Sequence, residues 1–241
     1  MGDYAMGLHF DDKYGRLKTY WGEEGLTLFL FLLFLTLFLA PFADSLPVRL
    51  LTSLIFSLLM GFGVLNISRH SLARFLAGIV ACAAIALRWM MHLVPSPAIL
   101  RLGSMVFLVF MGILTMAILS KVFSDTGPVT GHRIRGAIAA YLLFGITWSV
   151  LYGLLDQILP GAFSNSAAGA MYSANRQATI TYFSFVTLTT LGYGDITPTH
   201  DVTRMFAVME ALTGQLYPAT LLARLVSLEV SHRNGQRGDD P

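Results

Sequence analysis

Six long apolar stretches separated by short polar segments dominate the hydropathy pattern of the chain. A helix needs about 20 consecutive apolar residues to cross the roughly 30 Å hydrocarbon core of a bilayer. Runs of about this length occur at 25–43, 47–66, 72–94, 98–122, 134–158 and 202–229. The pattern therefore predicts an all-α chain with six membrane-spanning helices.

A further apolar segment, residues 178–189 (ATITYFSFVTLT), lies between the fifth and sixth runs. It is too short to span a bilayer, and it leads into TLGYGD at residues 190–195. Non-helical backbone is tolerated at membrane depth only where it is buried in protein or lines a water-filled cavity. We therefore expect a re-entrant half-membrane helix followed by a loop that lines a wet space.

Composition agrees with a membrane assignment. The 241 residues are 55% hydrophobic and only 12% charged, with a mean hydropathy of +0.64, which excludes an ordinary soluble domain. The single cysteine, Cys82, lies inside the third apolar run, so no intrachain disulfide can form. The net charge of +2 gives no indication of a nucleic-acid partner.

The distribution of Lys and Arg predicts the orientation of the helices, because cytoplasmic segments carry an excess of both. The segments on one side hold Lys13, Arg16, Lys18, Arg69, Arg74, Lys121, Arg133, Arg135, Arg233 and Arg237. The opposite side holds Arg49, Arg101, Arg176 and Arg204. We therefore expect both termini in the cytoplasm and residues 160–201 outside, in a plasma membrane that the compact chain suggests is a bacterial inner membrane.

The loop that follows the short helix has the residues of a cation site. Glycine populates positive φ freely, so Gly192 and Gly194 let successive carbonyl oxygens turn toward one axis. Hard alkali cations take oxygen ligands, and the Thr190 hydroxyl adds one to the carbonyls of Thr190, Leu191, Gly192 and Tyr193. One loop supplies only part of a cage, and the stretch occurs once in the sequence. The sequence thus predicts a homotetramer around a central pore.

This stretch resembles the signature of tetrameric potassium channels, with TTLGYGD carrying a Leu where that family has Val. The resemblance extends over residues 134–230, as outer helix, turret, pore helix, filter and inner helix. It implies a selectivity filter at Thr190 to Gly194, with K⁺ bound at Thr190, Leu191, Gly192 and Tyr193. It also implies that the residues supporting the filter are Thr189, Asp195, Tyr182 and Val186.

Three positions depart from the pattern of that family. Tyr182 and Phe183 stand where many members have consecutive tryptophans, and Phe183 cannot donate a hydrogen bond to Asp195. Val186 stands where some members place a carboxylate behind the filter. A buried carboxyl pair with Asp195 is therefore excluded.

The last apolar run contains two candidate hinge residues and one further candidate functional residue. Gly214 lies where the family often has a hinge glycine, and Pro218 removes a backbone hydrogen bond four residues later. Glu210, one turn before Gly214, is an intramembrane carboxylate. It is a candidate cavity residue or pore-helix contact, and the alternative is a structural hydrogen bond.

The first four runs invite comparison with a voltage sensor, but their charges favour a scaffold. Moving one charge across the membrane is worth about 2.3 kcal/mol per 100 mV, so steep gating needs several arginines on one helix. The run 98–122 has only Arg101 and Lys121, one near each end. Arg88 and His92 in the third run are read as interfacial anchors or as a proton-sensitive contact. The short Gly- and Pro-containing connector favours packing against the pore of the same subunit.

These observations divide the chain into five parts. We expect a cytoplasmic N-terminal segment (1–24), a four-helix membrane domain without a voltage sensor (25–123), a linker (124–132), a pore domain (133–230) and a short cytoplasmic tail (231–241). The predicted function is passive, K⁺-selective conduction that is non-voltage-gated or weakly voltage-dependent. The alternatives are a voltage-modulated or weakly selective cation channel and a non-conducting regulatory membrane subunit.

The predicted partners are other copies of the chain, membrane lipids and an unidentified gating ligand or accessory subunit. No cofactor is expected beside the transported K⁺. No enzyme is expected either, because an intramembrane serine protease would need a Gly-x-Ser-Gly nucleophile and a histidine in a later span, and the sequence has neither. A secondary transporter would show paired broken helices in two halves, whereas this chain has a single re-entrant segment.

Overall fold

A computed structural model describes residues 25–42, 45–66, 71–124, 130–165 and 176–238. An N-terminal helix, Gly25–Leu39, runs into the short 3-10 helix η1 (Ala40–Phe42). The other helices are α2 (Leu46–Asn66), α3 (Ser71–Leu93), α4 (Pro97–Ser124), α5 (Gly131–Ile158), α7 (Arg176–Leu188) and α8 (Asp201–Gly238). The expected N-terminal segment 1–24 and most of the expected linker 124–132 lie outside the described residues.

Helices occupy all six of the predicted runs, but within the described residues only four of them are long and apolar enough to cross a bilayer by length and composition. These four are α2, α3, α4 and α5. The helix Gly25–Leu39 is shorter than a span requires, and α8 falls outside the four because polar and charged side chains recur along it. The expectation of six spans is therefore supported for four helices.

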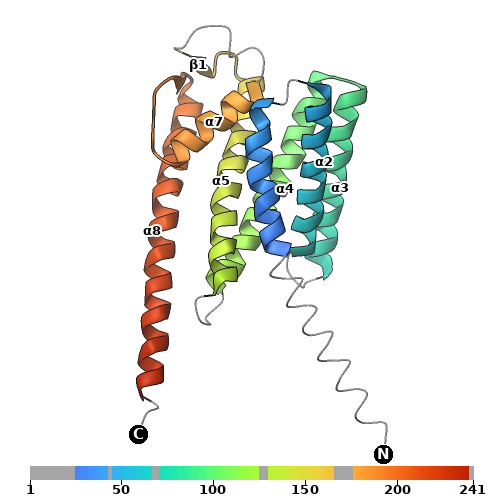
Figure 1. Cartoon of the computed structure of the whole chain (residues 1–241). Coiled ribbons are helices and arrows are strands. Elements are labelled where there is room, and N and C mark those ends of the chain that lie inside the picture. Colours follow the sequence, from blue (N-terminus) through green and yellow to red (C-terminus); the bar gives the residue numbers. More distant parts are fainter. Residues whose placement is uncertain (1–24, 43–44, 67–70, 125–129, 166–175, 239–241) are drawn as a thin grey trace, which may run out of the picture.

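The N-terminal helix packs with α2, α3 and α4 into a bundle on one side of the molecule (Figure 1). Its core is aliphatic and aromatic, with Leu33, Leu59 and Phe110 at 2% exposure or less. Ala77, Ala81 and Ala84 form the buried stripe of α3, and such small residues let membrane helices approach closely. We call this bundle, residues 25–124, the scaffold.

In the single chain the scaffold packs on α5 through α4. Helix α5 begins at Gly131, three residues before the predicted run. Thr130 caps it, because its hydroxyl oxygen accepts the N–H of Arg133 at 3.4 Å. A capping hydroxyl satisfies an otherwise unpaired N–H of the first turn, and hydropathy alone does not reveal that signal.

We use the name pore unit, after the predicted pore domain, for α5, α7, α8 and two short strands. In this unit α7 lies between α5 and α8 (Figure 1). Gly145 of α5 makes room for α7, since a Cβ at this position would lie 2.5 Å from a ring carbon of Phe185. The regular secondary structure of the described residues is helical, as predicted, apart from two short strands. Strands β1 (Phe163–Asn165) and β2 (Ile196–Pro198) pair antiparallel, with Ser164 opposite Thr197. Three-residue strands are too short to produce a recognisable alternation.

Candidate ion-coordination site

The loop after α7 is held at its start by the last turn of the helix. The Val186 carbonyl accepts the N–H groups of Leu191 at 2.9 Å and of Gly192 at 3.4 Å. The Thr190 N–H donates to the Thr187 carbonyl at 2.9 Å. Val186 therefore supports the loop through its backbone, while its side chain is buried.

The backbone of the loop alternates in handedness. Positive φ occurs at every second residue, with +59° at Thr190, +57° at Gly192 and +75° at Gly194. Successive peptide planes in an extended strand point to opposite sides, and a left-handed residue at every second position turns them toward one side. For a β-branched threonine this conformation is an outlier that the surrounding structure must hold in place. The positive φ values at Gly192 and Gly194 fit the expectation from the composition of the loop.

The loop is uncovered in the single chain. Leu191 is 59% and Tyr193 67% exposed, although both lie in a very apolar chain. Within the part of the chain that the structure describes, His, Cys, Asp and Glu side chains form no group that could hold a metal ion. The oxygen atoms available to a cation here are therefore backbone carbonyls and the Thr190 hydroxyl.

Asp195, just after the loop, is bound from two sides. Its Oδ1 accepts the N–H of Ile196 at 3.0 Å, and its carboxylate accepts a hydrogen bond from the Tyr182 hydroxyl of α7. Tyr182 thus donates to Asp195 the hydrogen bond that Phe183 cannot donate. Phe183 is buried in an aromatic cluster, with ring centroids 5.2 Å from Tyr152 and 5.1 Å from Phe163. That cluster fixes α7 against α5 and β1.

The inner helix α8 touches the base of the loop at Gly214. A Cβ on Gly214 would lie 1.8 Å from the Leu188 carbonyl oxygen, at the C-terminal end of α7. The same oxygen accepts the Tyr141 hydroxyl at 3.3 Å. One residue later, Gln215 Nε2 donates to Thr190 Oγ1 at 3.2 Å. Gly214 is therefore required for packing whether or not it is a hinge.

Sequence reasoning missed Gln215. Its signal was present, because an amide side chain on a membrane helix is costly unless it is hydrogen-bonded. The register that places it next to Thr190 depends on the crossing point of α7 and α8, which only the structure provides.

Glu210 is completely buried and contacts the pore helix instead of an open cavity. Ser184 Oγ donates to Glu210 Oε1 at 2.6 Å and also lies 2.8 Å from the Gly145 carbonyl. The Tyr152 hydroxyl is a polar neighbour of the carboxyl group, but neither this hydroxyl nor Glu210 Oε2 has a hydrogen-bond partner among the described residues. Ser184, which the sequence did not single out, joins α5, α7 and α8 at one point. The bond from Ser184 is a contact with α7 and also a structural hydrogen bond, so it fits both of these roles left open for Glu210.

The remaining candidate residues have local roles. Thr189 Oγ1 donates to the Phe185 carbonyl at 2.6 Å, so it closes the last turn of α7. Pro218 lies inside α8, which continues as a helix on both sides of it. The preceding residue, Tyr217, donates its hydroxyl to the Ala137 carbonyl of α5 at 2.9 Å. The segment around Pro218 is therefore attached to α5.

Comparisons with known proteins place the similarity in the pore unit. Residues 136–230 match a family model described as "Ion channel". The curated relatives include "Two pore potassium channel c" of Oryza sativa subsp. japonica, 36% identical over 90 residues. This match covers 37% of the present chain and 17% of the relative. Another is "Two-pore potassium channel 3" of Arabidopsis thaliana, 41% identical over 66 residues, or 25% of this chain and 15% of the relative.

The match thus spans less than a fifth of each curated relative. No solved structure matches the chain. The scaffold lies outside the residues that the family model matches. Together with the four apolar helices, these similarities define the class as a multi-pass membrane protein whose residues 136–230 resemble a potassium-channel ion pore.

Proposed function

We propose that the chain forms a homotetrameric K⁺ channel in which Thr190 to Gly194 of four subunits dehydrate and select the ion. The alternating positive φ values at Thr190, Gly192 and Gly194 are the observation that carries this proposal. They aim carbonyl oxygens to one side, as a dehydrated alkali cation requires. The names of the two plant relatives agree with K⁺ as the transported ion.

The proposed tetramer is supported by the division of α8 into two faces. Its buried residues, Thr203, Glu210, Gly214 and Tyr217, recur at helical spacing and face α5 and α7. Exposed apolar side chains occupy the other face, namely Met205, Val208, Met209, Leu212 and Leu216. In a tetramer this face and the exposed filter residues would meet the axis or the neighbouring subunits.

The proposed gate is the inner helix, with Gly214 and Pro218 as its proposed hinge. The scaffold is proposed to be a support and not a voltage sensor. Arg88 is bound inside it, because its Nε donates to Ser53 Oγ at 3.2 Å and its guanidinium lies 4.5 Å from the Phe56 ring centroid. His92 Nε2 lies 2.9 Å from the same hydroxyl. We place both chain ends in the cytoplasm and the protein in a plasma membrane.

The test is a bi-ionic measurement on purified protein in a planar bilayer, with K⁺ on one side and Na⁺ on the other. We expect a reversal potential near the K⁺ limit and no steep activation by voltage. The Gly192→Ala variant should lose this selectivity, because its φ of +57° disfavours any Cβ. Gly161→Ala is the matched control, since Gly161 also has positive φ and open space around it but lies in the outer turn.

Each other outcome points to a different function. A reversal potential near zero with stable currents indicates a weakly selective cation channel. Steep activation by voltage indicates a sensor in the scaffold. Correctly assembled protein without current indicates a regulatory subunit. Equal loss of selectivity in Gly192→Ala and Gly161→Ala would contradict the assignment of the filter.

A further inference from the structure

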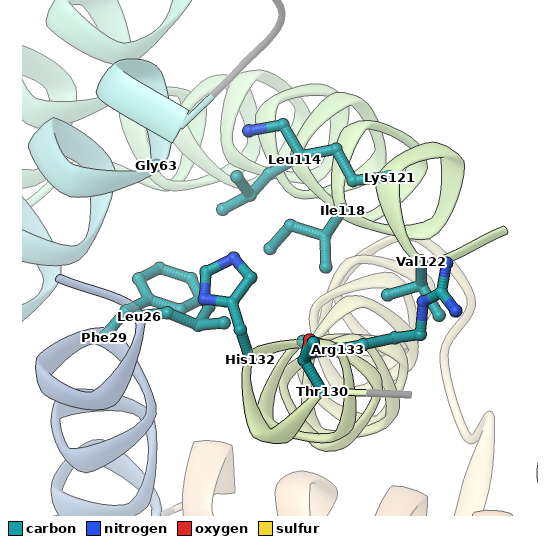
Figure 2. Close-up of a pocket in the computed structure, with 11 residues that line it drawn as sticks. Leu26, Phe29, Gly63, Leu114, Ile118, Lys121, Val122, Thr130, His132 and Arg133 are labelled. Carbon is teal, nitrogen blue, oxygen red and sulfur yellow. The ribbon is translucent and has the colours of Figure 1, made fainter. Parts of the chain in front are cut away.

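A cavity of about 430 Å³ lies between the scaffold and the pore unit, at the end of the molecule where α4 ends and α5 begins (Figure 2). Its volume falls within the roughly 300–1,000 Å³ typical of ligand sites. One part of its wall is apolar and includes Leu26 and Phe29 of the N-terminal helix and Leu114 and Ile118 of α4. This apolar part of the wall is therefore suited to contact with a hydrocarbon chain.

The other part of the wall is basic. Lys121 of α4 and His132 and Arg133 of α5 line the same cavity, and the described lining contains no Asp or Glu. In Figure 2 the His132 ring stands in the middle of the opening between Phe29 and Ile118, and Lys121 extends along the wall above Leu114. Arg74 adds a positive charge close enough to act electrostatically on Lys121. This part of the wall therefore offers basic side chains to an anionic group.

An apolar wall beside clustered cations matches an amphiphile with an anionic head. Helix ends at this side of the molecule carry the Lys and Arg excess that marks the cytoplasmic face. Anionic phospholipids are concentrated in that leaflet, and basic pockets between membrane helices at this level bind phosphate headgroups. The volume accommodates a headgroup and part of one acyl chain, while the rest of the lipid would remain in the bilayer.

The cavity is also connected to the inner helix. Val122 lines it, and the next residue, Phe123, accepts a hydrogen bond from Arg224 of α8 at its carbonyl oxygen. The Arg224 guanidinium lies 5.4 Å from the Phe123 ring centroid, and the Tyr217 ring lies 6.4 Å from it. A ligand that shifts the end of α4 would therefore change the contact that holds the lower half of α8.

We propose that this cavity binds the phosphate headgroup of an anionic phospholipid, and that its occupancy biases the position of α8 through Phe123 and Arg224. The proposed lipid binding does not depend on the proposed channel function. The regulatory part rests on the proposed channel function.

Binding is tested by native mass spectrometry of protein in detergent micelles that contain phosphatidylglycerol or phosphatidylcholine. We expect the natural protein to retain phosphatidylglycerol. Lys121→Gln should retain it about fivefold more weakly, because each cation near a membrane surface contributes roughly that factor. His132→Gln should have the same effect at a pH low enough to charge the histidine. Lys121→Arg should retain the lipid. Arg101→Gln, at the other end of α4, is the matched control. Ile118→Trp should displace the lipid by filling the cavity.

Several results would overturn the binding proposal. Equal loss in Lys121→Gln and Arg101→Gln would indicate general surface electrostatics. Displacement of the lipid by inorganic phosphate at equal concentration would identify free phosphate as the ligand. Equal retention of phosphatidylcholine would show that the basic wall plays no part.

Regulation is tested by K⁺ flux from vesicles with and without phosphatidylglycerol. We expect flux to depend on this lipid in the natural protein and not in Lys121→Gln, with the same ion selectivity in both. Lipid-independent flux would refute the regulatory part. Absence of flux in every lipid, with phosphatidylglycerol still retained, would refute the proposed channel function and leave the binding site intact.

Discussion

The scaffold and the pore unit are held together in different ways. In the scaffold the buried contacts are mainly between aliphatic side chains and small residues, such as Leu33, Leu59 and Ala81. In the pore unit polar side chains reach backbone carbonyls of other elements, as Ser184 does at Gly145 and Tyr217 at Ala137. The polar contacts gather where α7 and α8 meet the filter loop.

This difference follows from what each region must position. A scaffold needs shape complementarity, which apolar packing supplies with some tolerance. A row of carbonyl oxygens must be fixed to a fraction of an ångström, and hydrogen bonds with defined directions do this better than dispersion contacts. Changes in the scaffold should therefore alter stability, whereas changes in the pore unit should alter ion selectivity and gating.

Gly214→Ala should have the largest effect. Its Cβ would lie 1.8 Å from the Leu188 carbonyl oxygen, so α8 would have to move away from the base of the filter. We expect loss of K⁺ current and of tetramers in size-exclusion chromatography. Gly112→Ala in α4 is the control, since no atom lies within 4 Å of that Cβ. Normal current in Gly214→Ala would show that the filter does not depend on this contact.

Leu59→Ala should lower the stability of the scaffold without changing selectivity. Leu59 is 2% exposed, and a truncated core leucine costs about 2 kcal/mol or more through the cavity it leaves. A lower melting temperature in detergent, with an unchanged K⁺ over Na⁺ reversal potential, is the expected result. A change in selectivity would remove the distinction between the two regions.

Ser184→Ala should change ion selectivity and leave the scaffold unaffected. It removes the donor to Glu210 and leaves a buried carboxyl group with one neighbour fewer, at a cost of about 1–2 kcal/mol. Because the contact lies behind the filter, we expect a lower K⁺ over Na⁺ permeability ratio in the bi-ionic measurement. Ser120→Ala, which removes only an exposed bond within α4, should leave the ratio unchanged. Equal ratios in both variants would contradict a supporting role for Ser184.

The sequence predicted the helices better than the contacts between them. Hydropathy located the helices because burial in lipid demands long apolar runs. The glycines of 190–195 predicted a loop with positive φ, because glycine adopts that backbone freely. The roles of Ser184 and Gln215 could not be predicted, since each depends on the crossing of two helices distant in sequence. The same reason applies to β1 and β2, which pair residues more than 30 positions apart.

Glu210 illustrates this limit. Its intramembrane carboxyl group marked it as a functional candidate, but the direction in which it points depends on the rotation of α8. That rotation is set by Gly214 against Leu188 and by Tyr217 against α5. Neither contact can be derived from a linear pattern.

Tyr217→Phe should have the smallest effect and separates gating from selectivity. The ring would remain among Phe123, Tyr141 and Phe144, and only the hydroxyl bond to the Ala137 carbonyl would be lost. Such bonds within membranes contribute about 0.6 kcal/mol on average, which is enough to change a balanced equilibrium between open and closed channels nearly threefold.

Because the bond ties α8 to α5 next to Pro218, the change should appear in the open probability of single channels, while the reversal potential stays the same. Thr36→Val is the matched scaffold variant, since Thr36 is equally buried but bonds only to Leu32 in its own helix. An identical change of open probability in Thr36→Val would mean that gating responds to any buried hydroxyl. A change confined to Tyr217→Phe would place the moving part of the channel at the attachment of α8 to α5.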